Sequence, residues 1–398
     1  MEKSGKKMTS HEIKNLFLKF FIEKGHSHVP SSAIVPRNDK SLLFTNSGMV
    51  QFKDEFLGVK QPPNPKVVTC QNCLRAGGKH NDLENVGYTA RHHTFFQMLG
   101  NFSFGDYFKE TAITFAWELL TEVYELDERN LIVTVYDDDE ETYRIWRRKI
   151  GISDSHILQI GDNKGGKYAS DNFWQMAETG PCGPCTEIFF DYGPSVEGGL
   201  PGTENEGDRF VEIWNLVFMQ FYKDTKGKVS KLPVRCVDTG MGLERISAVL
   251  QGVTNNYQID TFSFLMAGAA KVLKVEEFNS VSLKVISDHI RAIFFLLREG
   301  INPGNEGRGY VLRRIIRRAV RYAYKCEIRE PFLARMVDVL VKDFTEPINK
   351  EEIESIKSKI TSEEEKFSMT FFRGMEILSE KIRKTNSDVL SGSTAFLL

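Results

Sequence analysis

The sequence predicts an α+β fold in which an antiparallel sheet flanked by helices comes first and an all-helical part follows. Two observations predict it. Short runs rich in β-branched and aromatic residues, several with two-residue alternation, are found up to about residue 255, where the strand signals stop. Beyond that point the apolar residues recur every three or four positions, as in helices. We therefore expect two domains, residues 1–255 and 256–398.

The first part contains the expected strands. Thr9 and Glu12 have the spacing of a capping box that opens a helix, and Gly25 ends it. Residues 131–136, 209–222 and 234–238 are β-prone, and residues 239–242 are expected to turn into a helix over 243–250. On the long strand 209–222, one face is expected to carry Val211, Ile213, Asn215, Val217, Met219 and Phe221, and the other Trp214 and Phe218. A strand that is apolar on both faces suits a sheet covered on both sides.

The second part is expected to be helical. Its periodicity predicts helices over 282–299 and 310–325, with a Gly/Pro/Asn loop between them, and a long charged helix over 350–384.

Length and composition exclude several classes of protein. The 398 residues suffice for two or three domains, and 41% hydrophobic residues, 27% charged residues and a net charge of −2 are ordinary for a soluble chain. No apolar run approaches the roughly 20 residues that span a bilayer, and the polar N-terminus does not resemble a secretory signal. Six cysteines in a chain of this size do not predict a disulfide framework. We expect a cytoplasmic protein with no membrane association.

Positive charge is concentrated in one region. Residues 281–330 contain 11 Lys/Arg and 5 Asp/Glu, a net charge of +6, which leaves −8 for the rest of the chain. The helix 310–325 is expected to carry one stripe of five arginines: Arg313, Arg314, Arg317, Arg318 and Arg321. Such a stripe is commonly just a solvated face. Here no acidic residue lies between Arg308 and Lys325, and the unrelieved repulsion favours a polyanionic partner.

Residues 73–82 and 91–98 predict a site for a nucleotide. A strand, a glycine-containing loop and a returning strand would place Arg75, Lys79 and an aromatic face together. Activation of a carboxylate by ATP needs positive charge at the α-phosphate and a platform for adenine. A surface loop with incidental basic residues fits the same pattern equally well.

Residues 237–245 are a second candidate segment. The glycines of Gly240-Met-Gly242 allow the backbone to approach a ligand closely, and the following helix N-terminus favours an anion near Arg245. The segment matches neither a P-loop nor a dinucleotide fingerprint. Taken alone, it is also what a plain strand-to-helix turn looks like.

Two Cys-x-x-Cys pairs, Cys70/Cys73 and Cys182/Cys185, lie more than a hundred residues apart, so they do not predict a zinc site. The histidines at 80, 92 and 93 have no accompanying Ser or Cys nucleophile motif, so a hydrolase is not predicted.

Taken in order, eight segments resemble the alanyl-tRNA synthetase family of class II aminoacyl-tRNA synthetases. They are residues 42–54, 75–93, 102–108, 170–176, 179–187, 212–215, 238–245 and 305–320. The resemblance covers nearly the whole chain. It implies a class II synthetase domain followed by a helical domain that recognises the tRNA acceptor stem and is truncated at its C-terminal end.

The resemblance also implies an activity and residue roles. The activity is ligation of alanine to tRNA(Ala): alanine and ATP form alanyl-adenylate and pyrophosphate, with Mg²⁺, and alanyl passes to the terminal adenosine of the tRNA. The catalytic residues would be Arg75 and Arg245. ATP would be bound by Arg75, Lys79, Phe96, Met98 and Arg245. Alanine would be bound by Arg75, Trp174, Asn215, Asp238 and Gly240. Glu212 would be a candidate Mg²⁺ ligand.

For tRNA, Asn305 resembles the residue that reads the G3:U70 pair, and the five arginines would hold phosphates. The family usually continues with an editing domain that contains zinc and with an oligomerising domain, so we expect no zinc here and a monomer. Two other functions compete. A catalytically silent tRNA-binding paralogue should have lost Arg75, Asp238 or Arg245, and another acyl-adenylating ligase would need neither Asp238 nor the arginine helix.

Overall fold

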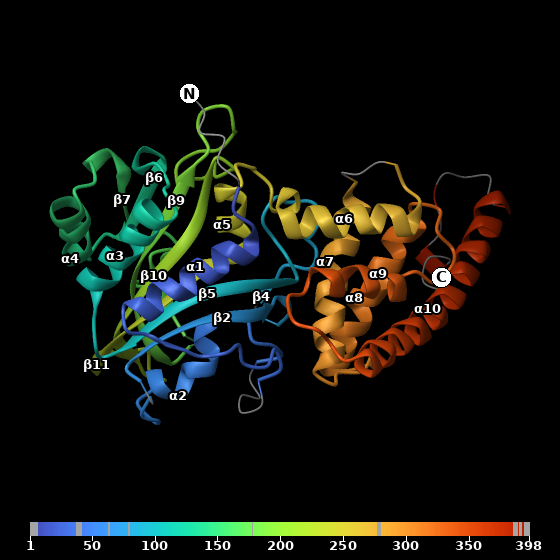
Figure 1. Cartoon of the computed structure of the whole chain (residues 1–398), viewed down its shortest axis with the longest axis horizontal. Helices are drawn as coiled ribbons and strands as arrows, with labels where there is room; N and C mark the ends of the chain where they lie inside the picture. The colour runs from blue at the N-terminus through green and yellow to red at the C-terminus, as the bar shows by residue number, and fades with distance from the viewer. Residues whose placement is uncertain are drawn as a thin grey trace. The chain divides into compact units, whose positions relative to one another are not determined.

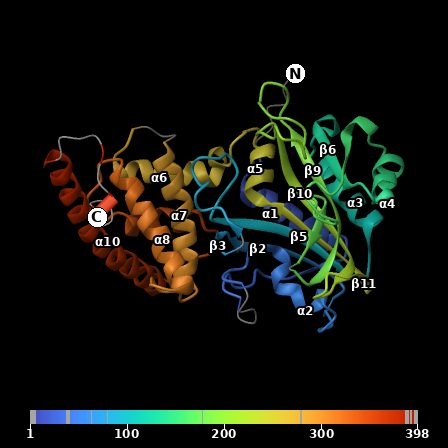
Figure 2. The same cartoon turned by 180° about the vertical axis from the view of Figure 1, so that it is seen from behind.

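The computed structural model of the protein describes residues 7–36, 42–62, 64–78, 80–176, 178–276, 280–384, 389 and 392–393. The chain forms two compact units, shown in Figure 1 and from behind in Figure 2. Unit 1 comprises Met1–Leu83 and Thr89–Thr261, and unit 2 comprises Glu84–Tyr88 and Phe262–Leu398. The boundary lies six residues beyond the expected position of 255. The inclusion of Glu84–Tyr88 in unit 2 was not expected.

Unit 1 is built on a nine-stranded sheet with the order β1-β2-β5-β11-β10-β9-β6-β7, and β8 pairs with β9. Its strands are β1 (Ser27–His28), β2 (Lys66–Leu74), β5 (Phe95–Phe104), β6 (Leu131–Tyr136), β7 (Ile157–Ile160), β8 (Phe173–Gln175), β9 (Gly180–Asp191), β10 (Phe210–Lys223) and β11 (Val229–Gly242). A separate hairpin contains β3 (Ala76–Gly77) and β4 (His80–Asn81). The sheet is antiparallel except for β1–β2 and β6–β7, the two pairs at its ends.

Helices cover one face of this sheet. They are α1 (Ser10–Glu23), α3 (Lys109–Glu118), α4 (Glu140–Arg144) and α5 (Leu243–Leu250). The capping box at Thr9 and Glu12 is confirmed, with each side chain bonded to the backbone of the other residue. Phe17 and Phe21 of α1 are fully buried, and their rings lie 5.8 and 6.3 Å from that of Trp214 on β10. The predicted face of β10 that carries Trp214 and Phe218 is therefore the one under these helices.

The opposite face is only partly covered. A 3-10 turn at Gly48–Phe52 and the short helix α2 (Lys53–Phe56) pack on it. Phe52 and Phe56 contact the ring of Phe102, in a cluster that also contains Val217 of β10. The rest of this face carries the polar residues that the sequence singled out.

Two strands differ from their predicted form. The run 131–136 is β6 as predicted, but the register of β10 shifts between residues 212 and 214 and between 217 and 221, so strict alternation fails there. Residues 239–242 are not a turn. They are paired with β10, Asn215 opposite Gly240 and Trp214 opposite Met241, because β11 stays in the sheet until α5 begins.

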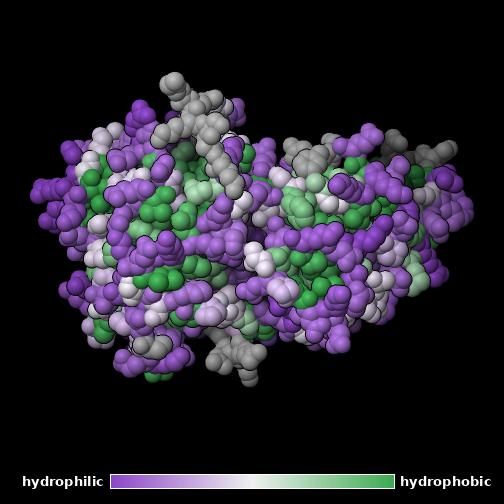
Figure 3. All heavy atoms as spheres, viewed as in Figure 1, coloured by the Kyte–Doolittle hydropathy of each residue, from purple (hydrophilic) through white to green (hydrophobic). Residues whose placement is uncertain are grey.

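The helices of unit 2 are α6 (Asp260–Leu273), whose first two residues belong to unit 1, α7 (Val281–Arg298), α8 (Gly307–Tyr324), α9 (Leu333–Leu340) and α10 (Lys350–Lys384). The three predicted helices are confirmed within three residues, whereas α6 and α9 were not predicted. Figure 3 shows mainly hydrophilic side chains, interrupted by small apolar patches, on the face it displays. Among the described residues no helix is long and apolar enough to cross a membrane.

Candidate active site

The hairpin of β2 and β5 positions the first group of candidate residues. Cys73 lies opposite Phe96, and the backbone N–H of Arg75 donates to Thr94 O at 2.8 Å. The Arg75 guanidinium lies 5.0 Å from the centre of the Phe96 ring, and its Nε donates to Asn46 O at 3.3 Å. The structure thus brings a cation and an aromatic face together at the end of β2. Lys79 lies outside the described residues.

Met98 and Gly240 mark a close approach of β5 and β11. Met98 lies opposite Gly242, and a Cβ built on Gly240 would come within 2.9 Å of the Met98 Sδ atom. The same sulfur accepts a hydrogen bond from the Gly48 N–H at 3.3 Å. A side chain at position 240 would have to displace the end of the Met98 side chain, so with glycine there the surface at this point is formed by backbone and a thioether.

Asp238 lies two residues before Gly240 and is 8% exposed. It is opposite Val217 on β10 and Phe102 on β5. Burial raises the pKa of its carboxyl to about 7. No described residue forms an ion pair with this desolvated carboxylate, which makes Asp238 a good candidate for pairing with a positively charged ligand.

Asn215 connects this region to β9. It lies opposite Gly240 on one side and Glu187 on the other, and its Nδ2 donates to Glu187 Oε1 at 3.1 Å. Its buried Oδ1 atom has no hydrogen-bond partner among the described residues, which leaves an acceptor for a ligand. Trp174 of β8 is half-buried and packs against the cluster that includes Cys185 and Val217.

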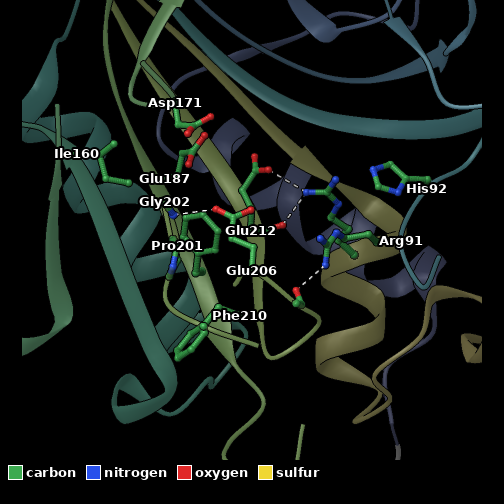
Figure 4. Close-up of a pocket in the computed structure, with 14 residues that line it drawn as sticks. Arg91, His92, Ile160, Asp171, Glu187, Pro201, Gly202, Glu206, Phe210 and Glu212 are labelled. Carbon is green, nitrogen blue, oxygen red and sulfur yellow. Dashed lines mark hydrogen bonds and ion pairs between the residues drawn. The ribbon is translucent and has the colours of Figure 1, made fainter. Parts of the chain in front are cut away.

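A cavity of about 240 Å³ is lined by Glu187, the hydrogen-bond partner of Asn215 (Figure 4). Of the residues singled out from the sequence, Arg245 and Glu212 line this cavity, whereas Arg75, Phe96, Met98, Trp174, Asn215, Asp238 and Gly240 are not among its lining residues. Arg91, His92 and Arg245 supply its basic side chains, and Asp171, Glu187, Glu206 and Glu212 supply its acidic ones. The other lining residues are Ile160, Phe189, Gly199, Pro201, Gly202, Gly207 and Phe210. Charges of both signs around one cavity suit a ligand that combines phosphates with a metal ion.

Both arginines of the cavity are held by carboxylates. Arg245 contacts Glu212, and the Arg91 Nη1 atom donates to Asp208 Oδ1 at 2.9 Å and to Gly207 O at 3.1 Å. Burial, followed by the charges of Glu212 and Asp171, raises the pKa of Glu187 well above its usual range. Burial lowers the pKa of His92. A bound cation would relieve the repulsion that acts on Glu187.

The carboxylates of the cavity and the cysteines of the chain differ in their suitability as metal ligands. Within the described part of the chain, no three His, Cys, Asp or Glu side chains are placed to hold a metal ion by themselves. Mg²⁺ is commonly held by one or two carboxylates together with substrate phosphates, and the carboxylates of this cavity suit that arrangement. The cysteines are different. All six are free thiols, and burial raises the pKa of Cys70 to about 12 and that of Cys73 still further, which opposes the thiolate form that zinc requires.

The arginines of α8 do not form one stripe, and that prediction is wrong for Arg318. Its side chain is 5% exposed, and it donates to His289 Nε2 at 3.0 Å and to Val86 O at 3.3 Å. The physical reason is helical geometry. Residue 318 lies three positions after Ile315 and four before Tyr322, so its side chain points to the same buried face of α8 as theirs. Arg321 is exposed, and Arg314 is exposed at the surface of unit 2.

The charge of α8 is also relieved by other elements of unit 2. Arg313 and Arg317 both pair with Glu363 of α10, at 3.0 and 3.1 Å, and Arg314 pairs with Glu84 at 2.6 Å. The sequence of α8 alone therefore overstates the electrostatic repulsion between its arginines, because acidic residues from outside the helix pair with three of them. The pair of Arg314 with Glu84 is exposed, so Arg314 can exchange carboxylate for phosphate at modest cost. Glu363 is buried, so the same exchange by both Arg313 and Arg317 would leave its carboxylate without a cation and would cost more.

Asn305 lies exposed in the loop before α8, and its Oδ1 accepts a hydrogen bond from Arg313. The loop is closed by a hydrogen bond from Gly304 N–H to Gly309 O at 2.9 Å. A Cβ on Gly309 would lie 2.7 Å from Asn302 O, so the tight loop requires glycine there.

Sequence reasoning assigned no role to Glu187, Asp171, Arg91 or His92. A signal existed for Glu187, because it lies two residues from Cys185 on β9 and so shares a face with Asn215 across the ladder. Arg91 lies in the segment 91–98 that was predicted to contribute to a nucleotide site, whereas no pattern marked Asp171; both residues reach the cavity from loops.

The mixed sheet flanked by helices belongs to a class of protein that the family profile identifies, the class II tRNA synthetases. The family profile described as tRNA synthetases class II (A) matches residues 12–398. The chain belongs to this family, which confirms the resemblance drawn from its segments. Among solved structures, apo histidyl-tRNA synthetase from S. aureus aligns over 67% of this chain and 75% of that chain, with 10% identity and a TM-score of 0.35.

The relatives within the family are more specific. The chain is 57% identical to proteins named Alanine--tRNA ligase from Bordetella avium, over 395 residues, and from Burkholderia multivorans, over 397 residues. Each alignment covers 98% of this chain and 45% of the relative. The chain therefore spans about half the length of the curated relatives that it matches.

Proposed function

We propose that this chain activates alanine with ATP and transfers it to tRNA(Ala). The observation that carries the proposal is the buried carboxylate of Asp238 on β11, with its pKa raised to about 7. Asn215 lies on the neighbouring strand β10, Arg75 directly follows β2, and Arg245 lies in the first turn of α5, which follows β11. An amino acid needs a fixed carboxylate for its ammonium group, and adenylation needs fixed cations for phosphate. The relatives named Alanine--tRNA ligase support alanine as the amino acid.

In the first step a carboxylate oxygen of alanine attacks the α-phosphorus of ATP. The bond from that phosphorus to the bridging oxygen breaks, and pyrophosphate leaves with the electron pair. Arg75 would neutralise charge that develops at the α-phosphate, supported by Lys79, and Arg245 would bind the γ-phosphate in the cavity. Phe96 would stack on adenine beside Met98.

Substrate size is proposed to be set on β8, β10 and β11. Asp238 binds the ammonium group, and Asn215 offers its Oδ1 acceptor nearby. Trp174 forms a bulky wall, and Gly240 leaves room only for a small ligand because Met98 lies over it. In this arrangement a methyl side chain fits and larger ones are excluded.

Mg²⁺ is proposed to bind between the acidic wall of the cavity and the phosphates, with Glu212 and Glu187 as its protein ligands. Mg²⁺ supplies charge neutralisation of the phosphates when bound. In the second step a hydroxyl of the terminal adenosine attacks the alanyl carbonyl carbon, and AMP leaves. We propose that Arg313, Arg314, Arg317 and Arg321 hold the acceptor stem, and that Asn305 reads its third base pair.

The test is exchange of labelled pyrophosphate into ATP, with each of the twenty amino acids in turn. Exchange that depends on alanine, with weaker exchange for glycine and serine, is the expected result. Exchange stimulated equally by a carboxylic acid without an amine would indicate a different acyl-adenylating ligase. Binding of tRNA with no exchange for any amino acid would indicate a silent tRNA-binding protein and would overturn the proposal.

A further inference from the structure

A short piece of the chain lies in the helical unit although the residues on both sides of it belong to the sheet unit. Glu84–Tyr88 belongs to unit 2, while Leu83 and Thr89 belong to unit 1. The chain therefore enters unit 2 and returns within five residues. We refer to Glu84–Tyr88 as the inserted segment.

The inserted segment packs on α7 and α8. Val86 is fully buried against Val285 of α7 and Tyr322 of α8. Gly87 has a φ of +89°, and a Cβ there would lie 2.7 Å from the Val285 Cγ2 atom. Only glycine satisfies both the backbone angle and the close approach, so the segment is fitted to this surface.

Polar contacts fix the segment at three positions. Glu84 pairs with Arg314 at 2.6 Å, and the hydroxyls of Tyr88 and Tyr322 lie 2.6 Å apart. Between them, Arg318 donates to the backbone oxygen of Val86 at 3.3 Å.

Arg318 differs from the other arginines of α8 because it is held in a buried network. It donates to His289 Nε2 at 3.0 Å, and His289 Nδ1 lies 2.9 Å from the Asp288 carboxylate. Asp288 and His289 are both fully buried. With Nδ1 protonated and Nε2 accepting, a neutral imidazole links the carboxylate to the guanidinium, which balances the two charges. These buried contacts hold the Arg318 guanidinium in the position from which it donates to Val86 O of the inserted segment.

Both ends of the inserted segment lead into the candidate active site. On the N-terminal side, Asp82 N–H donates to Arg75 O at 3.0 Å, one residue before Leu83. On the C-terminal side, Thr89 Oγ1 lies 2.9 Å from His92 Nδ1, and His92 lines the cavity next to Arg91. The segment is thus continuous in the chain with Arg75, which is proposed to bind ATP, on one side and with His92, which lines the cavity, on the other.

We propose that Arg318 is a positioning residue for adenylation: it holds the inserted segment on α7 and α8, fixes the loops that carry Arg75 and His92, and does not contact tRNA phosphate. This inference rests on the proposed function for its effect on activity. A misplacement of about 1 Å in groups that bind the reacting atoms is enough to cost a large factor in rate. The same helix then serves two purposes, with its exposed arginines directed to a polyanion and its buried one to the ATP loops.

The experiment compares Arg318→Met with Arg318→Lys and with the control Arg335→Met. Arg335 is an arginine of unit 2 that makes an exposed pair with Glu330 at 3.4 Å. In pyrophosphate exchange, Arg318→Met is expected to lower kcat/KM for ATP tenfold or more, with partial recovery in Arg318→Lys and no change in Arg335→Met. Amide hydrogen exchange should accelerate in residues 75–92 of Arg318→Met, while α1 keeps its protection.

A third measurement distinguishes a role of Arg318 in holding the inserted segment from direct contact of Arg318 with tRNA phosphate. The dependence of tRNA affinity on salt should have the same slope in Arg318→Met as in the wild type, because no phosphate contact is lost. A slope reduced by about 0.7–0.9 would show that Arg318 binds a phosphate and would overturn the proposal. Unchanged amide hydrogen exchange in residues 75–92 of Arg318→Met would also overturn the proposal. So would a lower unfolding midpoint of the variant together with unchanged kinetics of pyrophosphate exchange, because that result would show a purely structural role.

Two further arrangements keep the test decisive. If Arg318→Met does not fold, Tyr88→Phe with Tyr322→Phe removes a contact of the same segment without leaving a buried charge. The double variant should show a smaller decrease in kcat/KM for ATP and a smaller acceleration of amide hydrogen exchange in residues 75–92. If neither change occurs, the proposal is wrong. If the wild type shows no alanine-dependent exchange, the proposed function fails, whereas hydrogen exchange still decides the role of Arg318 because it needs no activity.

Discussion

The Nη1 atom of Arg245 lies 3.0 Å from the backbone oxygen of Glu212 and 3.0 Å from its Oε2 atom. The pair joins the first turn of α5 to β10, and both residues line the cavity. Each partner is proposed to bind a different part of the same ligand, Arg245 the γ-phosphate and Glu212 the metal ion. Binding of ATP with Mg²⁺ therefore has to exchange this contact for two new ones.

Glu212→Gln is expected to raise the Mg²⁺ concentration that half-saturates pyrophosphate exchange by about tenfold or more, as loss of a metal ligand or its support commonly does. High Mg²⁺ should restore part of the rate. The measurement is a Mg²⁺ titration at saturating alanine, with Asp127→Asn, which alters an exposed pair with Arg129, as the control. An unchanged titration curve would show that Glu212 only orients Arg245.

Arg75→Ala should lower kcat/KM for ATP by about 10²-fold or more, because the charge it neutralises develops in the transition state. Arg129→Ala is the matched control, since Arg129 forms an exposed ion pair with Asp127. The measurement is steady-state pyrophosphate exchange at varied ATP. Normal turnover in Arg75→Ala would remove Arg75 from the proposed mechanism.

The affinity for alanine should fall as pH falls below 7. Asp238 has a raised pKa of about 7 in the free protein, and only its ionised form can pair with an ammonium group, which remains charged throughout this range. The ionised fraction drops from about one half at pH 7 to about one tenth at pH 6, so KM for alanine should rise about fivefold. KM for ATP should change much less.

Asp238→Asn provides the control for that pH profile. The variant should bind alanine more weakly at every pH, and the pH dependence of KM between 6 and 8 should disappear. If KM for ATP rises as much as KM for alanine, Asp238 supports the end of β11 and does not bind the ammonium group.

Asn305 and Arg314 should differ in what they contribute to tRNA recognition. Arg314→Ala should weaken aminoacylation of G3:U70 and G3:C70 acceptor stems equally, because a phosphate contact carries no sequence information. Asn305→Ala should narrow the difference between the two stems, since a side-chain amide can bind base edges in the minor groove. The measurement is kcat/KM for both stems. Equal loss on both stems in Asn305→Ala would show that the loop only positions the tRNA.

Lys109→Ala should lower the free energy of unfolding by about 3–5 kcal/mol, because it leaves Asp139 buried without its cation. The Nζ–Oδ1 distance is 2.6 Å, and the two side chains are 3% and 5% exposed. Lys149→Ala is the matched control, since its pair with Glu110 is exposed and should contribute at most about 1 kcal/mol. Denaturant unfolding measures both. Equal losses would mean that burial of the Lys109 pair adds no stability.

Local patterns were sufficient for much of the fold. The β-branched run 131–136 is a strand with the predicted ends, and the capping box at Thr9 begins α1 as expected. Both signals are local, since the residues that decide the structure are neighbours in sequence. The irregular register of β10 was not predictable in this way, because it is set by pairing with β9 and β11.

The candidate site was harder to predict for the same reason. Resemblance supplied Arg75, Asp238 and Arg245, of which only Arg245 lines the cavity. The cavity is also lined by Arg91 and Asp171, which reach it from loops. The burial of Arg318 could not be read from α8 alone, because its partners His289 and Val86 come from α7 and from the inserted segment. Charge counted along one helix likewise missed Glu84 and Glu363.

The 2.9 Å separation between the Met98 sulfur and a Cβ placed on Gly240 has a consequence for protein engineering. A residue larger than glycine at 240 would have to displace the end of the Met98 side chain, and shortening Met98 alone removes the thioether that Gly48 contacts. The two positions therefore form a coupled pair in sequence space. A library that varies one position at a time would score each change as harmful and miss the paired replacements that reshape the amino-acid pocket.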